Sequence, residues 1–154
     1  MTAIVTQPSP DTIRITRDFA APPAKVWRAF TTPDLIRQWM TGPMDDPMPV
    51  CELDPRPGGA LRYVWRTEQG DMGLRGTIIE IEPEARIQHT ESFDDWPDQQ
   101  STIETTFTPT DTGTRVVMTI SYPSEEVRDM VAKTGMAQGV EASYARLDVR
   151  VLAA

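Results

Sequence analysis

The closing stretch of the chain decides the fold, and residues 124–152 read SEEVRDMVAKTGMAQGVEASYARLDVRVL. Ser124 followed by two glutamates is typical of a helix N-cap with acid in the first turn. The tripeptide Lys-Thr-Gly at residues 133–135 predicts a stop or a kink. Beyond it, apolar residues recur at helical spacing and predict one long amphipathic stripe: Met136, Val140, Tyr144, Leu147 and Val151.

The chain between residues 50 and 122 predicts strands with no helix among them. Strands are expected at 50–53, 60–67, 72–82, 85–93, 101–108 and 113–122. The residues Asp-Thr-Gly at 111–113 fit a tight hairpin between the last two. Another strand is expected near residues 13–19, where Ile13, Ile15 and Arg17 alternate with polar residues and therefore share one face.

Two short helices are expected between the first strand and the rest of the sheet. Proline in the first turn of a helix costs no hydrogen bond, so Pro22 and Pro23 fit a helix start. Thr32 fits an N-cap, with Pro33 at the first helical position. The residues that follow, 40–49, carry three methionines among turn formers and predict a loop.

This order predicts a single α+β domain over residues 12–152, preceded by a flexible leader at 1–11. About seven antiparallel strands form a curved sheet, with two short helices and the long closing helix. A helix that arrives last can lie on the concave side of such a sheet and enclose a cavity. Gly139 weakens this helix by roughly 1 kcal/mol relative to alanine, which predicts a close approach of helix and sheet there.

Composition narrows the function classes. The 154 residues carry a net charge of −8, which repels phosphate backbones and anionic lipids and disfavours nucleic-acid and membrane-surface roles. Cys51 is the only cysteine, so no disulfide forms within one chain, as is usual in a reducing compartment. No stretch is long and apolar enough to span a bilayer, and no secretory signal is visible, so a cytoplasmic location is expected.

Several segments resemble a known family. They are FAAP at residues 19–22, VWRAF at 26–30, TPDLIRQW at 32–39, DPRPGG at 54–59, GTIIEIEP at 76–83 and the run from 135 to 147. The chain resembles helix-grip proteins, which include START domains, polyketide cyclases and birch-pollen allergens. More narrowly, it is similar to stand-alone bacterial homologues of the activator of the 90-kDa heat-shock protein's ATPase. The resemblance implies a β-α-α-β6-α fold and a cavity for a small hydrophobic molecule.

The strand at 85–93 carries the candidate catalytic residues. Ile87, His89, Glu91 and Phe93 share one face, which their apolar members assign to the cavity. His89 and Glu91 have attachment points roughly 6.5 Å apart, which makes a direct hydrogen bond awkward and favours a ligand between them. Burial in an apolar pocket would raise the pKa of Glu91 and suit it to act as a general base. The alternatives are a histidine satisfied by a neighbour and a glutamate paired with Arg62 or Arg66.

The predicted cavity lining combines inward-facing strand residues with the closing helix. Loop methionines would line an entrance or fill a gap in the core, and the tyrosines would orient a polar ligand end or only pack. Trp96, on an acidic loop, is expected to be a lid, a dimer contact or a side chain folded onto its own loop. The lining residues are Trp39, Met40, Met44, Tyr63, Trp65, Ile87, His89, Glu91, Phe93, Met118, Ile120, Tyr122, Met136, Val140 and Tyr144.

The remaining chemistry is limited. One histidine and one cysteine cannot assemble a zinc site of three or four nitrogen and sulfur ligands, and no phosphate-binding or dinucleotide motif occurs, so neither metal nor cofactor is expected.

Three functions remain open for this chain. The first is binding of a small hydrophobic or aromatic molecule. The second is a polyketide cyclase-like or hydrolase-like reaction using His89 and Glu91. The third is a co-chaperone or other interaction role, including a homodimer, although eukaryotic activators contact their chaperone through an additional N-terminal domain for which 154 residues leave no room.

Overall fold

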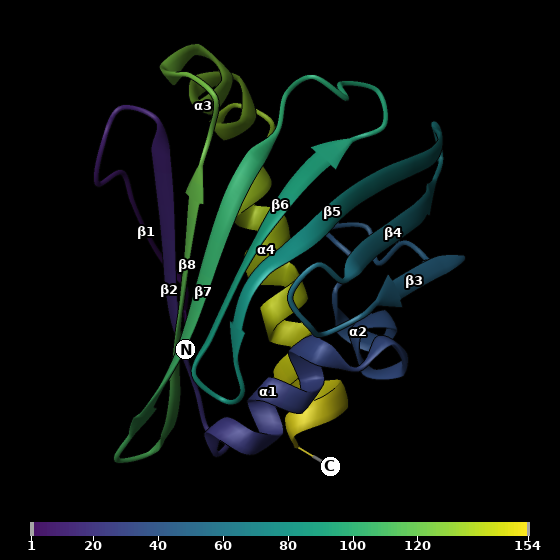
Figure 1. Ribbon diagram of the computed structural model, residues 1–154. Helices are drawn as coiled ribbons and strands as arrows, with labels where there is room; N and C mark the ends of the chain where they lie inside the picture. Colours follow the sequence, from purple (N-terminus) through teal and green to yellow (C-terminus); the bar gives the residue numbers. More distant parts are fainter. Residues whose placement is uncertain (1, 154) are drawn as a thin grey trace.

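The structure is a computed structural model that describes residues 2–153. Its strands are β1 (Ile4–Thr6), β2 (Thr12–Phe19), β3 (Val50–Leu53), β4 (Ala60–Thr67), β5 (Gly70–Glu82), β6 (Arg86–Phe93), β7 (Ser101–Thr110) and β8 (Gly113–Ser121). Its helices are α1 (Pro23–Thr31), α2 (Pro33–Trp39), α3 (Glu125–Ala132), α4 (Met136–Arg146) and the π-helical turn η1 (Leu147–Leu152). This order confirms the predicted α+β helix-grip fold (Figure 1).

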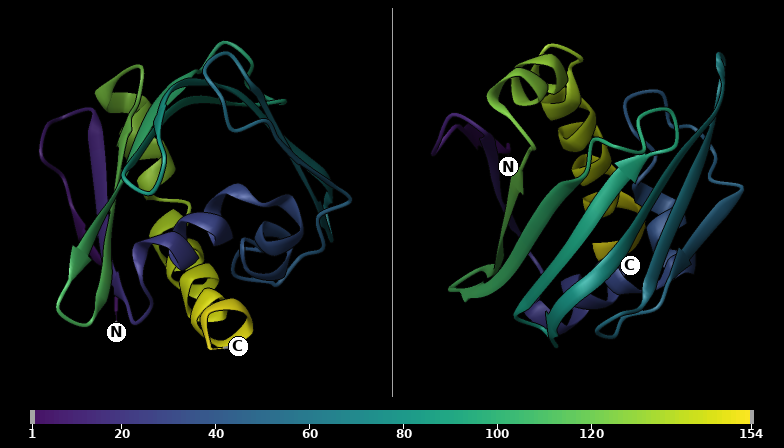
Figure 2. Two further views of the ribbon diagram at one scale, coloured as in Figure 1. Left: turned by 60° about the horizontal axis from the view of Figure 1, so that its bottom comes forward. Right: turned by 45° about the horizontal axis from the view of Figure 1, so that its top comes forward.

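Within the described residues, eight strands form one antiparallel sheet in the order β1-β2-β8-β7-β6-β5-β4-β3. The sheet curves around α4, and α1 and α2 lie on the same concave side (Figures 1 and 2). The strand beyond the predicted seven is β1, which lies within the expected flexible leader and pairs with β2 from Ile4↔Thr16 to Thr6↔Arg14. Sequence pattern missed it because three exposed residues at a sheet edge carry no burial signal.

The helix boundaries follow the predicted signals. Pro23 opens α1 and Pro33 opens α2, and the Ser124 side chain accepts a hydrogen bond from the Val127 backbone N–H at the start of α3. Thr32 occupies the N-cap position of α2, although its side chain makes no capping hydrogen bond. The predicted stop lies where expected, because Gly135 adopts a left-handed φ of 82° and separates α3 from α4.

A β-bulge in β5 keeps its apolar residues on the inner face. The register shifts by one residue between Ile78, opposite His89, and Glu80, opposite Gln88, so Ile79 is the extra residue. Strict alternation would turn Ile81 outward, whereas the bulge places it opposite Ile87 on the inner face. The bulge therefore lies beside the predicted catalytic strand.

The core fills one side of the concave face. Ile13, Ile15 and Phe19 of β2 are buried, and Arg17, on the same face, is buried with them. The Arg17 guanidinium lies 2.8 Å from a carboxylate oxygen of Asp148 and so ties β2 to η1. A second, smaller cluster lies under β3, β4 and β5 and contains Ile36, Met48, Cys51, Leu61, Tyr63 and Leu74.

Candidate functional site

His89 and Glu91 of β6 contact each other directly. Nε2 of His89 lies 2.9 Å from Oε2 of Glu91, so the prediction that a ligand would separate them was wrong. The gap between their backbone positions is closed because the rotatable bonds of the glutamate bring its carboxylate back to the ring. A carboxylate only accepts hydrogen bonds, so Nε2 of His89 is the donor in this contact. Nδ1 of His89 is buried and has no hydrogen-bond partner among residues 2–153.

The arginines proposed as partners of Glu91 bind other acids. Arg62 makes two hydrogen bonds to Asp94, at 2.7 and 2.8 Å, and Arg66 lies 3.2 Å from Asp71. The two arginines cannot reach Glu91 because successive side chains of a strand point to opposite faces of the sheet. Arg62 and Arg66 alternate with Tyr63 and therefore lie on the opposite face of β4.

The part of the predicted lining nearest α1 is packed by rings. Trp39 is 1% exposed, and its Nε1 donates a hydrogen bond to the Ala29 carbonyl at 3.0 Å. Its ring lies 4.8 Å from Phe30 and 6.0 Å from Tyr144, between centroids. Tyr144 also meets Phe19 edge-on at 5.2 Å. Trp39 and Tyr144 therefore occupy the core of this side, where they contact neighbouring rings.

The part of the predicted lining on β4, β5 and β6 contains side chains that reach solvent. Met72 pairs with Trp65 and Phe93 pairs with Leu74, so all four lie on the inner face. Met72 is nevertheless 41% exposed and Phe93 37% exposed, and the side chain of Glu91 is 30% exposed. Residues that face the concave side yet reach solvent show that no other part of the chain between residues 2 and 153 covers this end of the sheet.

Two tyrosines border this open part. Tyr63 and Tyr122 are buried, and burial is the main cause that raises the pKa of each hydroxyl. The pKa of Tyr63 is raised further by Cys51 and then by the negative charge of Glu91, and the pKa of Tyr122 is raised further by Glu91. Neither hydroxyl forms a hydrogen bond within the part of the chain that the structure describes.

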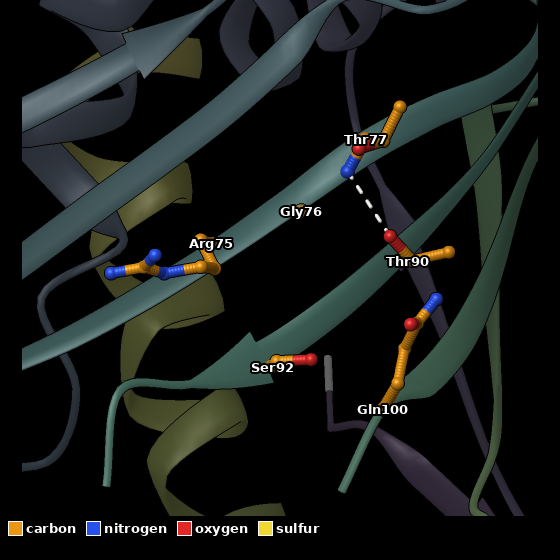
Figure 3. A pocket seen from close by; sticks show the side chains of 6 residues that line it. All are labelled: Arg75, Gly76, Thr77, Thr90, Ser92 and Gln100. Atoms are coloured by element: carbon orange, nitrogen blue, oxygen red, sulfur yellow. Dashed lines mark hydrogen bonds between the residues drawn. The ribbon is translucent and has the colours of Figure 1, made fainter. Parts of the chain in front are cut away.

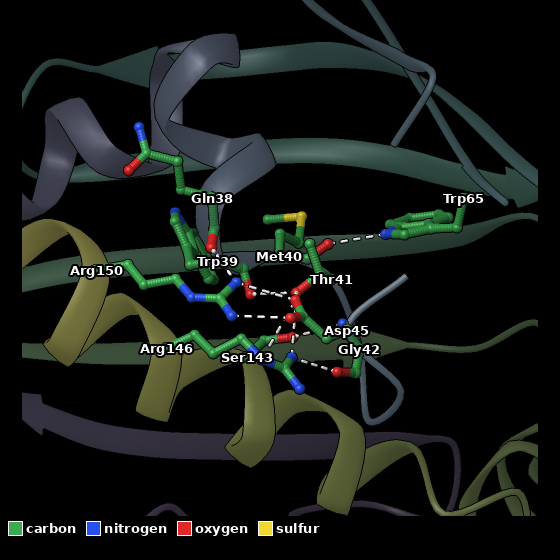
Figure 4. A network of polar contacts seen from close by, with 10 residues as sticks. All are labelled: Gln38, Trp39, Met40, Thr41, Gly42, Asp45, Trp65, Ser143, Arg146 and Arg150. Atoms are coloured by element: carbon green, nitrogen blue, oxygen red, sulfur yellow. Dashed lines mark hydrogen bonds and ion pairs between the residues drawn. The ribbon is translucent and has the colours of Figure 1, made fainter. Parts of the chain in front are cut away.

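The loop at residues 40–49 is tied to α4 and η1 by polar contacts (Figure 4). Asp45, which adopts a positive φ of 53°, binds Arg150 through both carboxylate oxygens, at 3.0 and 2.8 Å, and Thr41 at 2.8 Å. Arg146 donates to the Thr41 hydroxyl and the Gly42 carbonyl. These contacts hold the loop against the helix.

The three methionines predicted to line an entrance differ in burial. Met44 is 69% exposed, Met48 is buried in the smaller core cluster, and Met40 is partly buried, with its carbonyl accepting a hydrogen bond from Trp65 Nε1 at 2.8 Å. Gly139 of α4 faces this loop, since a Cβ there would lie 3.2 Å from Pro43 Cδ. The close approach predicted at Gly139 is therefore to the loop and not to the sheet.

The rest of the predicted lining belongs to the main core or its margin. Ile87 and Ile120 are buried in it, and Met118, Met136 and Val140 pack against it while partly exposed. A hollow of about 230 Å³ lies instead on the outer face, with α4 behind the sheet (Figure 3). It is lined by Arg75, Gly76, Thr77, Thr90, Ser92 and Gln100, none of which was predicted to line the cavity.

Comparisons with known proteins agree with this architecture. Residues 20–151 match the family model "Activator of Hsp90 ATPase homolog 1-like protein". The chain belongs to this family. A crystal structure of a Rhodobacter sphaeroides protein matches with 33% identity and a TM-score of 0.92, covering 99% of both chains. The protein Ms6760 from Mycobacterium smegmatis matches with 26% identity and a TM-score of 0.83, covering 98% of this chain and 99% of its own.

A third match is the protein CV1439 from Chromobacterium violaceum, with 26% identity, a TM-score of 0.81 and coverage of 93% of this chain and 98% of the other. A search of curated proteins found no match. Membership of this family supports a ligand-binding helix-grip fold in general.

The described residues contain no helix long and apolar enough to cross a membrane. They also contain no group of three or more histidine, cysteine or acidic side chains placed to hold a metal ion. Sequence reasoning missed Met72, because it lies in the first part of β5, where Gly70, Gly73 and Gly76 break the pattern. It also missed Asp45, whose role depends on arginines about a hundred residues away.

Proposed function

We propose that this protein binds a small apolar molecule on the uncovered part of its concave face, the inner surface formed by Tyr63, Trp65, Met72, Glu91 and Phe93. The supporting observation is the exposure of Met72 and Phe93, which face the side occupied by the helices. Apolar side chains that remain exposed on a concave surface lose contact with water when a ligand covers them, at roughly 25 cal/mol per Å².

Binding of a neutral fluorescent probe such as phenylnaphthylamine tests this function. Its fluorescence should rise on binding, and the change Met72→Ser should weaken binding about threefold or more, since it removes apolar contact area. Val149→Ser is the matched control, because Val149 is an exposed apolar residue of η1 and is not one of the residues that form this surface. Equal binding by the wild type and both variants would place the probe elsewhere and contradict the proposal.

The enzyme hypothesis is less well supported by the geometry. In His89, Nε2 is engaged by Glu91 and Nδ1 is buried, so neither nitrogen is presented to a substrate. General acid–base catalysis requires a group within hydrogen-bond reach of the reacting proton. The arrangement suits His89 to orient Glu91, which is the polar group that reaches the exposed face.

A further inference from the structure

Glu91 is a carboxylate side chain without an arginine or lysine partner among the described residues. It contacts the imidazole of His89 at 2.9 Å, and none of the ion pairs among residues 2–153 joins it to an arginine or a lysine. The arginines of β4 and β5 bind other acids, Arg62 and Arg75 to Asp94 and Arg66 to Asp71. Oε2 binds His89, while Oε1 accepts no hydrogen bond from the described residues.

The surroundings of this carboxylate are aromatic. Tyr63, Trp65 and Phe93 lie on the same inner face, with Tyr63 and Trp65 in edge-to-face contact at 6.0 Å. Ring faces attract cations, and a partly buried carboxylate without a counter-charge favours one strongly. The hydroxyls of Tyr63 and Tyr122, whose pKa values the charge of Glu91 raises, form no hydrogen bond with the described residues and add two oxygen acceptors.

A ligand with an anionic end group would be repelled at this position. It would approach Glu91 against like charge, on a chain whose net charge is −8. A neutral ligand would leave the carboxylate partly desolvated and unpaired, which is costly.

Resting on the proposed function, we infer that the ligand of this face is an organic cation, an apolar or aromatic molecule that carries a protonated amine. The ammonium binds Oε1 of Glu91, and the apolar body covers Phe93 and Met72. His89 is a positioning residue, because its Nε2–H holds the carboxylate toward the ligand.

Three probes with one aromatic body and different end groups test this inference: naphthylmethylamine, naphthylmethanol and naphthoate. Calorimetry should give the tightest binding for the amine, by about tenfold over the alcohol, and the weakest for the acid. In the Glu91→Gln variant the amine should lose about tenfold in affinity while the alcohol changes by less than about twofold. Glu104→Gln is the control, because it removes the same charge from the outer face of β7, where Glu104 binds Arg86.

The outcomes separate this inference from the proposed function. Equal binding of all three probes, tighter binding of the acid, or an amine preference that survives in Glu91→Gln would overturn the inference and leave apolar binding intact. Binding of none of them would overturn both.

If the Glu91→Gln variant does not fold, a measurement on the wild-type protein tests the same inference. His89 is the only histidine, so its two ring nitrogens are identified in a nitrogen-labelled sample without mutation. The spectrum should show the Nε2–H form, and the amine at saturation should shift the Nε2 signal more than the alcohol does. An unmoved signal would contradict a site at Glu91.

Discussion

The two sides of the concave face are built from the same sheet and are occupied differently. Under β2, β7 and β8, the rings of Phe19, Phe30, Trp39, Phe107 and Tyr144 contact one another and exclude water. Under β5 and β6, Met72 and Phe93 face inward and are exposed. The α1 helix lies against β7 and β8 on the first side, and α2 lies against β3, where its Ile36 joins the smaller core cluster. A sheet can therefore have one half that supplies stability and one half that remains available for binding.

Removal of a large ring from the packed side should have the largest effect. Trp39→Ala should lower the free energy of unfolding by about 3–5 kcal/mol, since it empties a filled position and leaves the Ala29 carbonyl without its donor. Urea denaturation measures the change. Trp96→Ala, at an exposed tryptophan, should change it by less than about 0.5 kcal/mol. A similar loss in both variants would erase the distinction between the two sides.

The contact between loop and helix should have a smaller effect that depends on pH. Hydrogen bonds from Arg150 and then Thr41 hold the pKa of Asp45 well below its usual range. A carboxyl whose pKa is lowered by folding stabilises the protein above its ordinary pKa, and this contribution is lost as pH falls through the folded value. Asp45→Asn keeps a residue that tolerates positive φ and should cost about 1 kcal/mol at neutral pH, since the pair is exposed.

The difference in unfolding free energy between wild type and Asp45→Asn should therefore shrink below about pH 4. Urea denaturation over a pH series measures it. A difference that stays constant from neutral to acidic pH would show that Asp45 acts through its backbone and not through its charge.

Truncation on the open side should affect binding more than stability. Phe93→Ala removes a ring that is 37% exposed, so unfolding free energy should fall by less than about 1 kcal/mol. Affinity for the neutral probe should fall about fivefold or more. Parallel denaturation and probe titrations make the comparison. A large stability loss without a change in affinity would place Phe93 in the core.

Deletion of single tyrosine hydroxyls should have the smallest effect. Tyr63→Phe and Tyr144→Phe remove hydroxyls that form no hydrogen bond with the described residues, so each should change the unfolding free energy by less than about 0.5 kcal/mol. Tyr63→Phe alone should also weaken amine binding. Equal effects of both changes on binding would remove the assignment of Tyr63 to the open side.

The sequence by itself determined the elements and their inner faces. Alternation in β2 and helical spacing in α4 follow from burial on one side, and burial on one side is what sequence periodicity records. This is why Arg17 could be assigned to the apolar face of β2 before its partner was known. The capping serine, the stop at Gly135 and the Asp-Thr-Gly hairpin are local signals, and each was confirmed.

Only the tertiary structure decided what lies opposite each inner face. Trp39 and Phe93 both face inward, but Trp39 contacts α1 and α4, whereas Phe93 reaches solvent. The contact of His89 with Glu91 and the binding of Asp45 by Arg146 and Arg150 depend on side-chain reach and on residues distant in sequence. Periodicity specifies the direction in which a side chain points, and only the packed chain specifies the distance to whatever it meets.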